Sequence, residues 1–245
     1  MRSQRRLYRN QGAVGFIPQD FTSEWKLEET TGTTAYDSKG INNGTASVDL
    51  SNLTEAGFVG NRFNFLNQRG VVVPANASLE VSDGTTNKSF SISFWQKITE
   101  GGSAHWTMGY SNGSSIIWWW YAYQNIWRLK VYNSDGSSLF LEFPTSGLTA
   151  LSSGIDDGKH ITLVFNPNEV AGQHIKGYVN GEKNPNSNSG TINILKTDPL
   201  AKLTFGADPR SNNLNSSGVA LDEIKYYVGK ALTQEESLGI YNTEK

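Results

Sequence analysis

The sequence predicts an all-β protein, an antiparallel two-sheet sandwich of the jelly-roll kind with one short C-terminal helix. Short segments of alternating apolar and polar residues recur from Phe21 onward, turn residues separate them, and 25 glycines suit a chain with many turns. A helical pattern occurs only near the C-terminus. A length of 245 residues suits one large β domain or two small ones, and no linker divides the chain. We therefore expect one jelly-roll domain over residues 21–245.

Residues 1–20 differ from the rest and are expected to form an extended basic arm. They show little alternation, include Pro18, and carry four arginines, which are Arg2, Arg5, Arg6 and Arg9. Such segments are usually solvated tails, but a basic arm can also order against an acidic surface of a neighbouring subunit. The arm lacks the apolar run of a secretory signal. We therefore expect synthesis in a cytoplasm, and action outside it only after release by lysis or as part of an assembled particle.

The most informative segment is the aromatic run of residues 116–123, which is followed by an alternating segment over residues 126–132. Residues two apart in a strand share a face. If residues 124–125 form a two-residue turn, Trp118 and Trp120 lie on the core face. A three-residue turn would instead shift the pairing by one and reverse the faces. The two-residue turn is the one we adopt.

With that turn, Trp119 stands opposite Lys130, and Tyr121 stands opposite Arg128, on the face turned away from the core. Four large rings there present several hundred Å², and roughly 300–600 Å² is already the largest apolar patch of a typical soluble monomer. A ligand, another subunit or the chain's own loops should cover it. The expected contact face comprises Trp95, Trp119, Tyr121, Tyr123, Arg128, Lys130 and Tyr132.

Other strands follow from the same alternation. Residues 90–97 place Phe90 and Phe94 inward, and they place Trp95 and Lys97 outward as a second pair of ring and cation. Further strands are expected over residues 139–143, 161–165, 175–179 and 221–228, with tight turns at 133–136 and 180–181. At the C-terminus, residues 233–236 form a capping box that begins a helix, with Leu238 and Tyr241 on one side of it.

Composition excludes several classes of function. A net charge of −2 argues against a dedicated nucleic-acid binder. No apolar run approaches the length of a membrane span. Cysteine is absent, so neither disulfides nor a thiolate metal site contribute. The three histidines lie in separate segments, with no recognisable nucleophile motif beside them.

Five segments resemble the laminin G-like, concanavalin A-like lectin-glucanase jelly-roll superfamily, in the type found in bacteria and phages. In order they cover roughly residues 24–242, although the third lacks the tryptophan of the family pattern. The segments are residues 25–32 continuing to 37–40, 90–97, 157–160, 178–181, and 221–224 continuing to 231–236. The resemblance implies the fold, but it does not imply one function, because this architecture carries lectins, glucanases, adhesion domains and virion components.

The same resemblance bears on whether the protein is an enzyme and whether it binds a metal ion. Glucanases of the superfamily carry three acidic residues on one strand face, and that run does not occur here, so we expect no enzyme. Many relatives hold a structural calcium ion near the first and last strands. The corresponding residues are Asp37 and Asp222, with Glu28 as a weaker third. The alternative, which we favour, is that Asp37 caps its own turn and that Asp222 accepts hydrogen bonds from backbone amides.

Two functions remain open. The first is a non-catalytic structural protein of a phage-type virion or surface assembly, in which the arginine arm and the aromatic face contact other subunits and an oligomer forms. The second is a glycan-binding adhesion module whose rings stack on sugars and whose cations favour acidic ones. The assembly role ranks first, because it explains the arm and the absence of an export signal.

Overall fold

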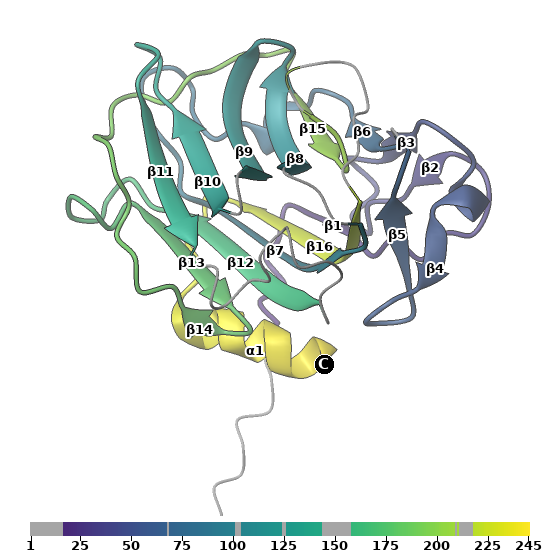
Figure 1. Ribbon diagram of the computed structural model, residues 1–245. Coiled ribbons are helices and arrows are strands. Elements are labelled where there is room, and N and C mark those ends of the chain that lie inside the picture. The colour runs from purple at the N-terminus through teal and green to yellow at the C-terminus, as the bar shows by residue number, and fades with distance from the viewer. Residues whose placement is uncertain are drawn as a thin grey trace, which may run out of the picture.

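The computed structural model describes residues 17–67, 69–100, 104–123, 126–143, 158–208, 210 and 218–245. Two antiparallel sheets lie face to face and one α-helix packs outside them (Figure 1). This is the predicted jelly-roll sandwich with a short C-terminal helix. None of the helices in these ranges has the length and apolar character that crossing a membrane would require.

One sheet, called here the helix-side sheet, lies next to α1. Its strands in spatial order are β14 (Glu182–Lys183), β13 (Ile175–Val179), β12 (Lys159–Phe165), β7 (Phe90–Ile98), β16 (Val219–Val228), β5 (Asn61–Phe65) and β4 (Thr54–Ala56), with β1 (Ser23–Trp25) paired to β16.

The other sheet, called the aromatic sheet, contains the tryptophan run. Its strands in spatial order are β11 (Ser138–Phe143), β10 (Ile126–Tyr132), β9 (Ser115–Tyr123), β8 (Ala104–Asn112), β15 (Lys202–Phe205), β6 (Val71–Val73), β3 (Gly44–Ala46) and β2 (Thr34–Ala35). Two short 3₁₀ helices, η1 (Leu50–Asn52) and η2 (Ala77–Leu79), lie in the connections.

The core between the sheets is strongly aromatic, as alternation predicted. Trp118 and Trp120 of β9 are fully buried, and Trp118 stacks on Phe90 of β7 with ring centroids 5.8 Å apart. The indole N–H of Trp120 donates to Gln96 Oε1 on the opposite sheet at 2.7 Å. This bond satisfies a buried polar group that would otherwise cost free energy. It also ties the two sheets together at the centre of the aromatic run.

The register of β9 with β10 is the one predicted for a two-residue connection. Trp119 pairs with Lys130, Tyr121 pairs with Arg128, and Tyr123 pairs with Ile126. The alternative register, which would have turned Trp119 and Tyr121 inward, is therefore wrong. The connecting residues 124–125 themselves lie outside the described part of the chain.

The helix α1 (Gln234–Glu244) begins as predicted and crosses the outer face of the helix-side sheet (Figure 1). Its capping box is complete, since Thr233 Oγ1 accepts the Glu236 N–H at 3.2 Å and Glu236 Oε2 accepts the Thr233 N–H at 2.9 Å. Ser237 then bonds to Thr162 of β12 at 2.8 Å between their buried hydroxyls. The helix is thus fixed to the sheet along its first turns.

Candidate functional site

The strand register gathers the predicted contact residues into rows across the outer face of the aromatic sheet. One row runs from Trp106 in β8 through Tyr121 and Arg128 to Glu142 in β11. A second row contains Trp119, Lys130 and Phe140. Side chains directly opposite each other on neighbouring strands are close enough to interact. Rings and charged groups are therefore direct neighbours across four adjacent strands, β8 to β11.

The rings on this face pack against one another and form a small second core. Trp106 and Trp119 stack with centroids 5.2 Å apart and planes 15° apart, and Tyr121 lies 4.4 Å from Trp119. Trp119 and Tyr121 consequently are only 6% and 8% exposed. They point away from the main core as predicted, but their ring faces are covered. Tyr123, at the edge of the cluster, is 44% exposed.

Arg210 covers the stacked tryptophans. Its guanidinium lies 4.5 Å from the ring centroid of Trp106 and 5.1 Å from that of Trp119. Asp208 holds it with three hydrogen bonds, from Nε to Oδ1 at 3.0 Å and to Oδ2 at 3.1 Å, and from Nη2 to Oδ2 at 2.7 Å. These bonds raise the pKa of Arg210 above its usual value. The result is a fixed, permanently charged group whose side chain is still 47% exposed.

Two further cations complete the face. Lys130 Nζ lies 4.7 Å from the ring centroid of Tyr132, and Arg128 forms an ion pair with Glu142 at 2.7 Å. A cation over a ring is attracted by the negative face of the π system. Lys130 thus has a ring but no carboxylate as its partner within the described residues. We call this set the outer face: Trp106, Trp119, Tyr121, Tyr123, Arg128, Lys130, Tyr132 and Arg210.

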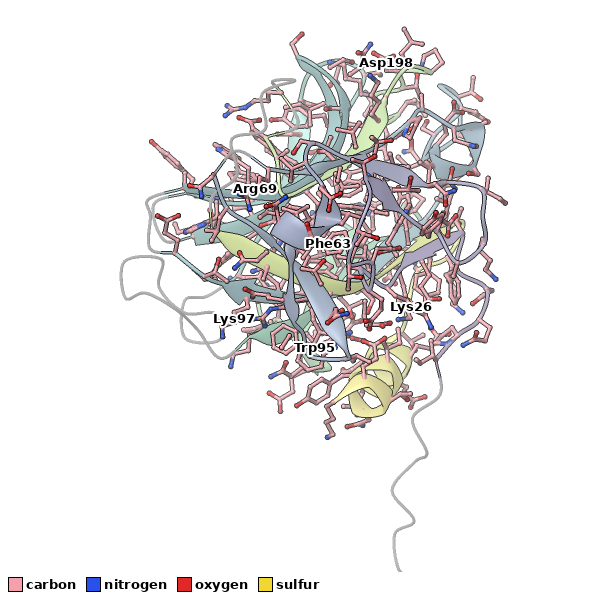
Figure 2. The ribbon with its side chains drawn as sticks, turned by 90° about the vertical axis from the view of Figure 1, so that its right-hand side faces the viewer. Lys26, Phe63, Arg69, Trp95, Lys97 and Asp198 are labelled. Atoms are coloured by element: carbon pink, nitrogen blue, oxygen red, sulfur yellow. The ribbon has the colours of Figure 1, made fainter. Side chains whose placement is uncertain are left out.

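Trp95 does not belong to the outer face, and its expected place there is a correction. It lies in β7 of the helix-side sheet, whereas the other contact residues lie in β9 and β10. Figure 2 shows Trp95 beside α1, far from Asp198, which bonds to Asn112 at the end of β8. Phe58 stacks on Trp95 at 4.8 Å, and Tyr241 of α1 lies 5.7 Å away. Alternation gave its direction correctly, but it could not say to which sheet it belongs.

Sequence reasoning missed Trp106 and the pair of Arg210 and Asp208. Alternation places Trp106 on the same face as Met108, which points inward, and only the register shift between these two residues in β8 turns Trp106 outward. Arg210 had no local signal. It lies about ninety positions from Trp119 in the sequence, and only the folded chain brings the two together.

The strongest cluster of titratable groups lies elsewhere, beneath α1. Lys225 Nζ is 2.6 Å from Glu244, 2.8 Å from Glu223 and 3.2 Å from Glu24. Burial raises the pKa of Glu244 to about 7, against the attraction of Lys225. All four side chains are buried. Carboxylates with shifted pKa values are common in active sites. This cluster, however, is covered by the helix that it anchors.

His160 takes part in this buried region as a neutral group. Burial, and next the charge of Lys225, lower its pKa to about 3. Its Nε2 is 2.9 Å from Ser93 Oγ and 3.6 Å from Glu244 Oε2. The contact with Glu244 is therefore not an ion pair near neutral pH. His160 fills space between Trp95 and Tyr241 and bonds to a serine.

The two predicted calcium ligands hold separate loops. Asp37 Oδ1 accepts the backbone N–H groups of Glu24 at 2.9 Å and Lys39 at 3.1 Å, and its Oδ2 accepts that of Asn42 at 3.0 Å. Backbone N–H groups repel a cation, and calcium requires several oxygen ligands. These hydrogen bonds fit the alternative interpretation, in which Asp37 stabilises its own turn and does not bind calcium.

Asp222 also accepts hydrogen bonds from backbone N–H groups. Its Oδ2 accepts the backbone N–H groups of Phe58 at 2.8 Å and Val59 at 3.1 Å, while Glu28 accepts that of Asn61. No group of three or more potential acidic, histidine or cysteine ligands occurs among the residues that the structure describes. A bound calcium ion thus stays a prediction that rests on the family resemblance.

The arginine arm falls largely outside the described residues, including Arg2, Arg5, Arg6 and Arg9. The end of the arm is visible and contacts the domain. The hydroxyl of Tyr227 donates to the carbonyl of Pro18 at 3.2 Å, and Asp20 pairs with Lys230 at 2.9 Å. Residues 18–20 are therefore attached to the outer side of the helix-side sheet.

Solved structures with a similar fold include parts of several toxins and one enzyme. The receptor-binding domain of botulinum neurotoxin mosaic serotype C/D shares 16% identity with a TM-score of 0.65, over 91% of this chain and 51% of that chain. The botulinum neurotoxin serotype D ligand-binding domain in complex with N-acetylneuraminic acid shares 16% identity with a TM-score of 0.64, over 91% and 50%. This chain therefore spans about half the length of those domains.

A Trypanosoma rangeli sialidase in complex with 2,3-difluoro-KDN shares 13% identity with a TM-score of 0.63, over 92% of this chain and 33% of that chain. At such identities the likeness establishes the fold alone. No curated protein matches the sequence significantly. A family model described as the concanavalin A-like lectin/glucanases superfamily, of laminin G type, matches residues 71–236. With two thirds of its length matched and with the jelly roll that the family implies, the chain belongs to the concanavalin A-like lectin/glucanases superfamily.

Proposed function

We propose that this protein is a non-catalytic carbohydrate-binding module that meets its ligand at the outer face of the aromatic sheet. The observation that carries the proposal is the arrangement of three cations on one aromatic surface. Arg210 and Lys130 lie over rings, and Arg128 is held by Glu142. Groups fixed before binding lose little conformational freedom when a ligand arrives.

The geometry favours acidic sugars that contact ring edges and cations. The broad faces of Trp119 and Tyr121 are already occupied, so a sugar does not stack on them. Tyr123 and Tyr132 lie at the margin of the cluster, where an exposed ring can pack against the C–H groups of a sugar. Lys130 lies next to Tyr132 and has no carboxylate among its described contacts, which leaves its charge available to an anionic substituent.

This proposal reverses the order in which the sequence ranked the two functions. Two of the similar structures are a receptor-binding domain and a ligand-binding domain in complex with N-acetylneuraminic acid, and a third is a sialidase. These support glycan binding, and none of the three is a virion component. The assembly role of the arginine arm stays an untested prediction.

A glycan array that contains neutral glycans and glycans ending in N-acetylneuraminic acid tests the proposal, followed by titration calorimetry on the best ligand. The double variant Tyr123→Ala/Lys130→Gln should weaken binding at least tenfold. Tyr36→Ala/Lys26→Gln is the matched control, because both residues are exposed and lie outside the outer face. Equal binding by the two variants would contradict the site, and an array without any bound glycan would contradict the function.

A further inference from the structure

A concave feature of the described residues lies apart from the outer face. It is a groove of about 760 Å³ between α1 and the hairpin of β13 and β14, on the helix side of the molecule (Figure 1). Pockets of about 300–1,000 Å³ are typical of small-molecule sites. Tyr241 and Leu238 line it from the helix, and residues 180–183 line it from the hairpin. Nothing in the outer face overlaps with these residues.

The walls of the groove are fixed in position. Asn180 and Gly181 both have positive φ, as a tight hairpin turn requires. A Cβ at Gly181 would come within 2.7 Å of the Leu238 Cα, so this turn and the helix approach each other as closely as backbone allows. At the far end, Glu244 docks on Lys225. The helix therefore cannot close the groove without breaking buried contacts.

Several polar groups that line the groove have no partner among the described residues. The side chains of Lys159, Glu182, Gln234 and Asn242 form no hydrogen bond or ion pair with other described side chains or backbone groups. Lys183 has only a contact with Gln173 at 3.4 Å. Lys245 Nζ lies 4.8 Å from the ring centroid of Tyr241. Three ammonium groups and one carboxylate therefore face this space, which favours a ligand with negative charge.

The side-chain amides of Gln234 and Asn242 indicate which uncharged groups the ligand should carry. An amide side chain donates and accepts hydrogen bonds at once, and a hydroxyl group does the same. Gln234 and Asn242 thus match neighbouring hydroxyls, while Leu238 and Tyr241 supply an apolar strip for C–H groups. We propose that this groove is a second binding site, which takes a sugar unit bearing a carboxylate or sulfate group. The site is independent of the outer face and does not depend on glycan binding there.

Titration calorimetry with a galacturonic acid trisaccharide, its sulfated galactose counterpart, neutral galactotriose and sodium sulfate tests this proposal on the full chain. We expect at least one acidic trisaccharide to bind at least tenfold more tightly than galactotriose. Lys159→Gln/Lys183→Gln should weaken that binding at least tenfold, whereas Lys26→Gln/Lys202→Gln, with the same change in charge at exposed sites elsewhere, should not.

A spectroscopic measurement locates the binding independently of the variants. Because Tyr241 contacts Trp95, groove binding should shift the indole N–H resonance of Trp95. The Tyr123→Ala/Lys130→Gln variant should keep both the affinity and the shift. The proposal is overturned if neither acidic trisaccharide binds at millimolar concentration. It is also overturned if sodium sulfate binds equally well, or if the two lysine double variants bind alike.

Discussion

The helix-side sheet and the aromatic sheet both place aromatic rings and cations on the face turned away from the core, yet they use them differently. On the helix-side sheet, Lys225 lies among three glutamates, and α1 covers the whole set. On the aromatic sheet, Arg210 and Lys130 lie on rings and keep contact with solvent. Buried cations need carboxylates to offset their loss of hydration, whereas exposed ones do not. The same residue types thus indicate structure in one place and binding in the other.

The largest expected effect is on the helix side of the molecule, where a buried lysine is compared with a lysine near the surface. Lys225→Met leaves three buried glutamates without a cation, and we expect a loss of about 3–5 kcal/mol in the free energy of unfolding. Lys230→Met removes a lysine that pairs with Asp20 and Glu236 near the surface, and should cost about 1 kcal/mol or less. Urea denaturation of both variants measures the contrast. Equal losses would mean that the buried cluster contributes little to helix docking.

Trp120 and Trp119 are neighbours in β9, but Trp120 lies in the main core and Trp119 lies in the small outer core. Trp120→Ala empties a fully buried site and removes the bond to Gln96, so we expect a loss of about 4 kcal/mol. Trp119→Ala should cost roughly half as much, because its site opens to solvent once Arg210 moves. Thermal and urea unfolding check the order. A larger loss for Trp119 would show that the outer cluster is primarily structural.

The stability of the helix-side sheet should depend on pH because of Asp222 in β16. Burial raises the pKa of Asp222 to about 7 in the folded protein, above the value of 3.8 for an unperturbed aspartate. Between these values the folded state binds more protons than the unfolded state, so stability falls as pH rises from about 4 to 7. Asp222→Asn keeps an acceptor for the Phe58 and Val59 N–H groups and removes the charge.

We expect the Asp222→Asn variant to lose less stability than the wild type over that pH range, by roughly 1–3 kcal/mol. Denaturation at pH 4.5 and pH 8 measures the difference, and Asp37→Asn serves as the comparison at another buried carboxylate that accepts backbone N–H groups. Parallel curves for the wild type and Asp222→Asn would contradict the raised pKa.

The smallest expected effect belongs to the outer face. Arg128→Gln breaks the ion pair with Glu142, whose side chains are 24% and 38% exposed. A pair this exposed contributes about 0.5 kcal/mol. Stability should therefore barely change, while glycan affinity should fall. A stability loss above about 2 kcal/mol would place Arg128 among the structural residues instead.

Local patterns in the sequence predicted most of the fold. Strand β13 has the predicted bounds, and the capping box at Thr233 and the register of Trp119 with Lys130 are confirmed. Each of these follows from residues that are neighbours in sequence. The family resemblance then supplied the jelly-roll order of the strands, which periodicity alone does not determine.

The candidate sites were predicted less well, because they depend on contacts between distant segments. Alternation turned Trp95 away from the core but could not assign it to the sheet under α1. Trp119 is covered by Trp106 and Arg210, and one side of the groove is set by the close approach of Gly181 to Leu238. No short-range pattern contains these pairings. The sequence therefore predicted which side chains point away from the core, but it did not predict how exposed they are to solvent.

The most direct test of glycan binding at the outer face is an NMR titration that follows the seven tryptophan indole N–H signals with the best ligand from the array. Trp106 and Trp119 lie in the outer face, whereas Trp95 lies near the groove and Trp25 is buried between the sheets. We predict saturable shifts of Trp106 and Trp119 with Trp25 unchanged. Saturable glycan binding that leaves Trp106 and Trp119 unmoved would contradict the account.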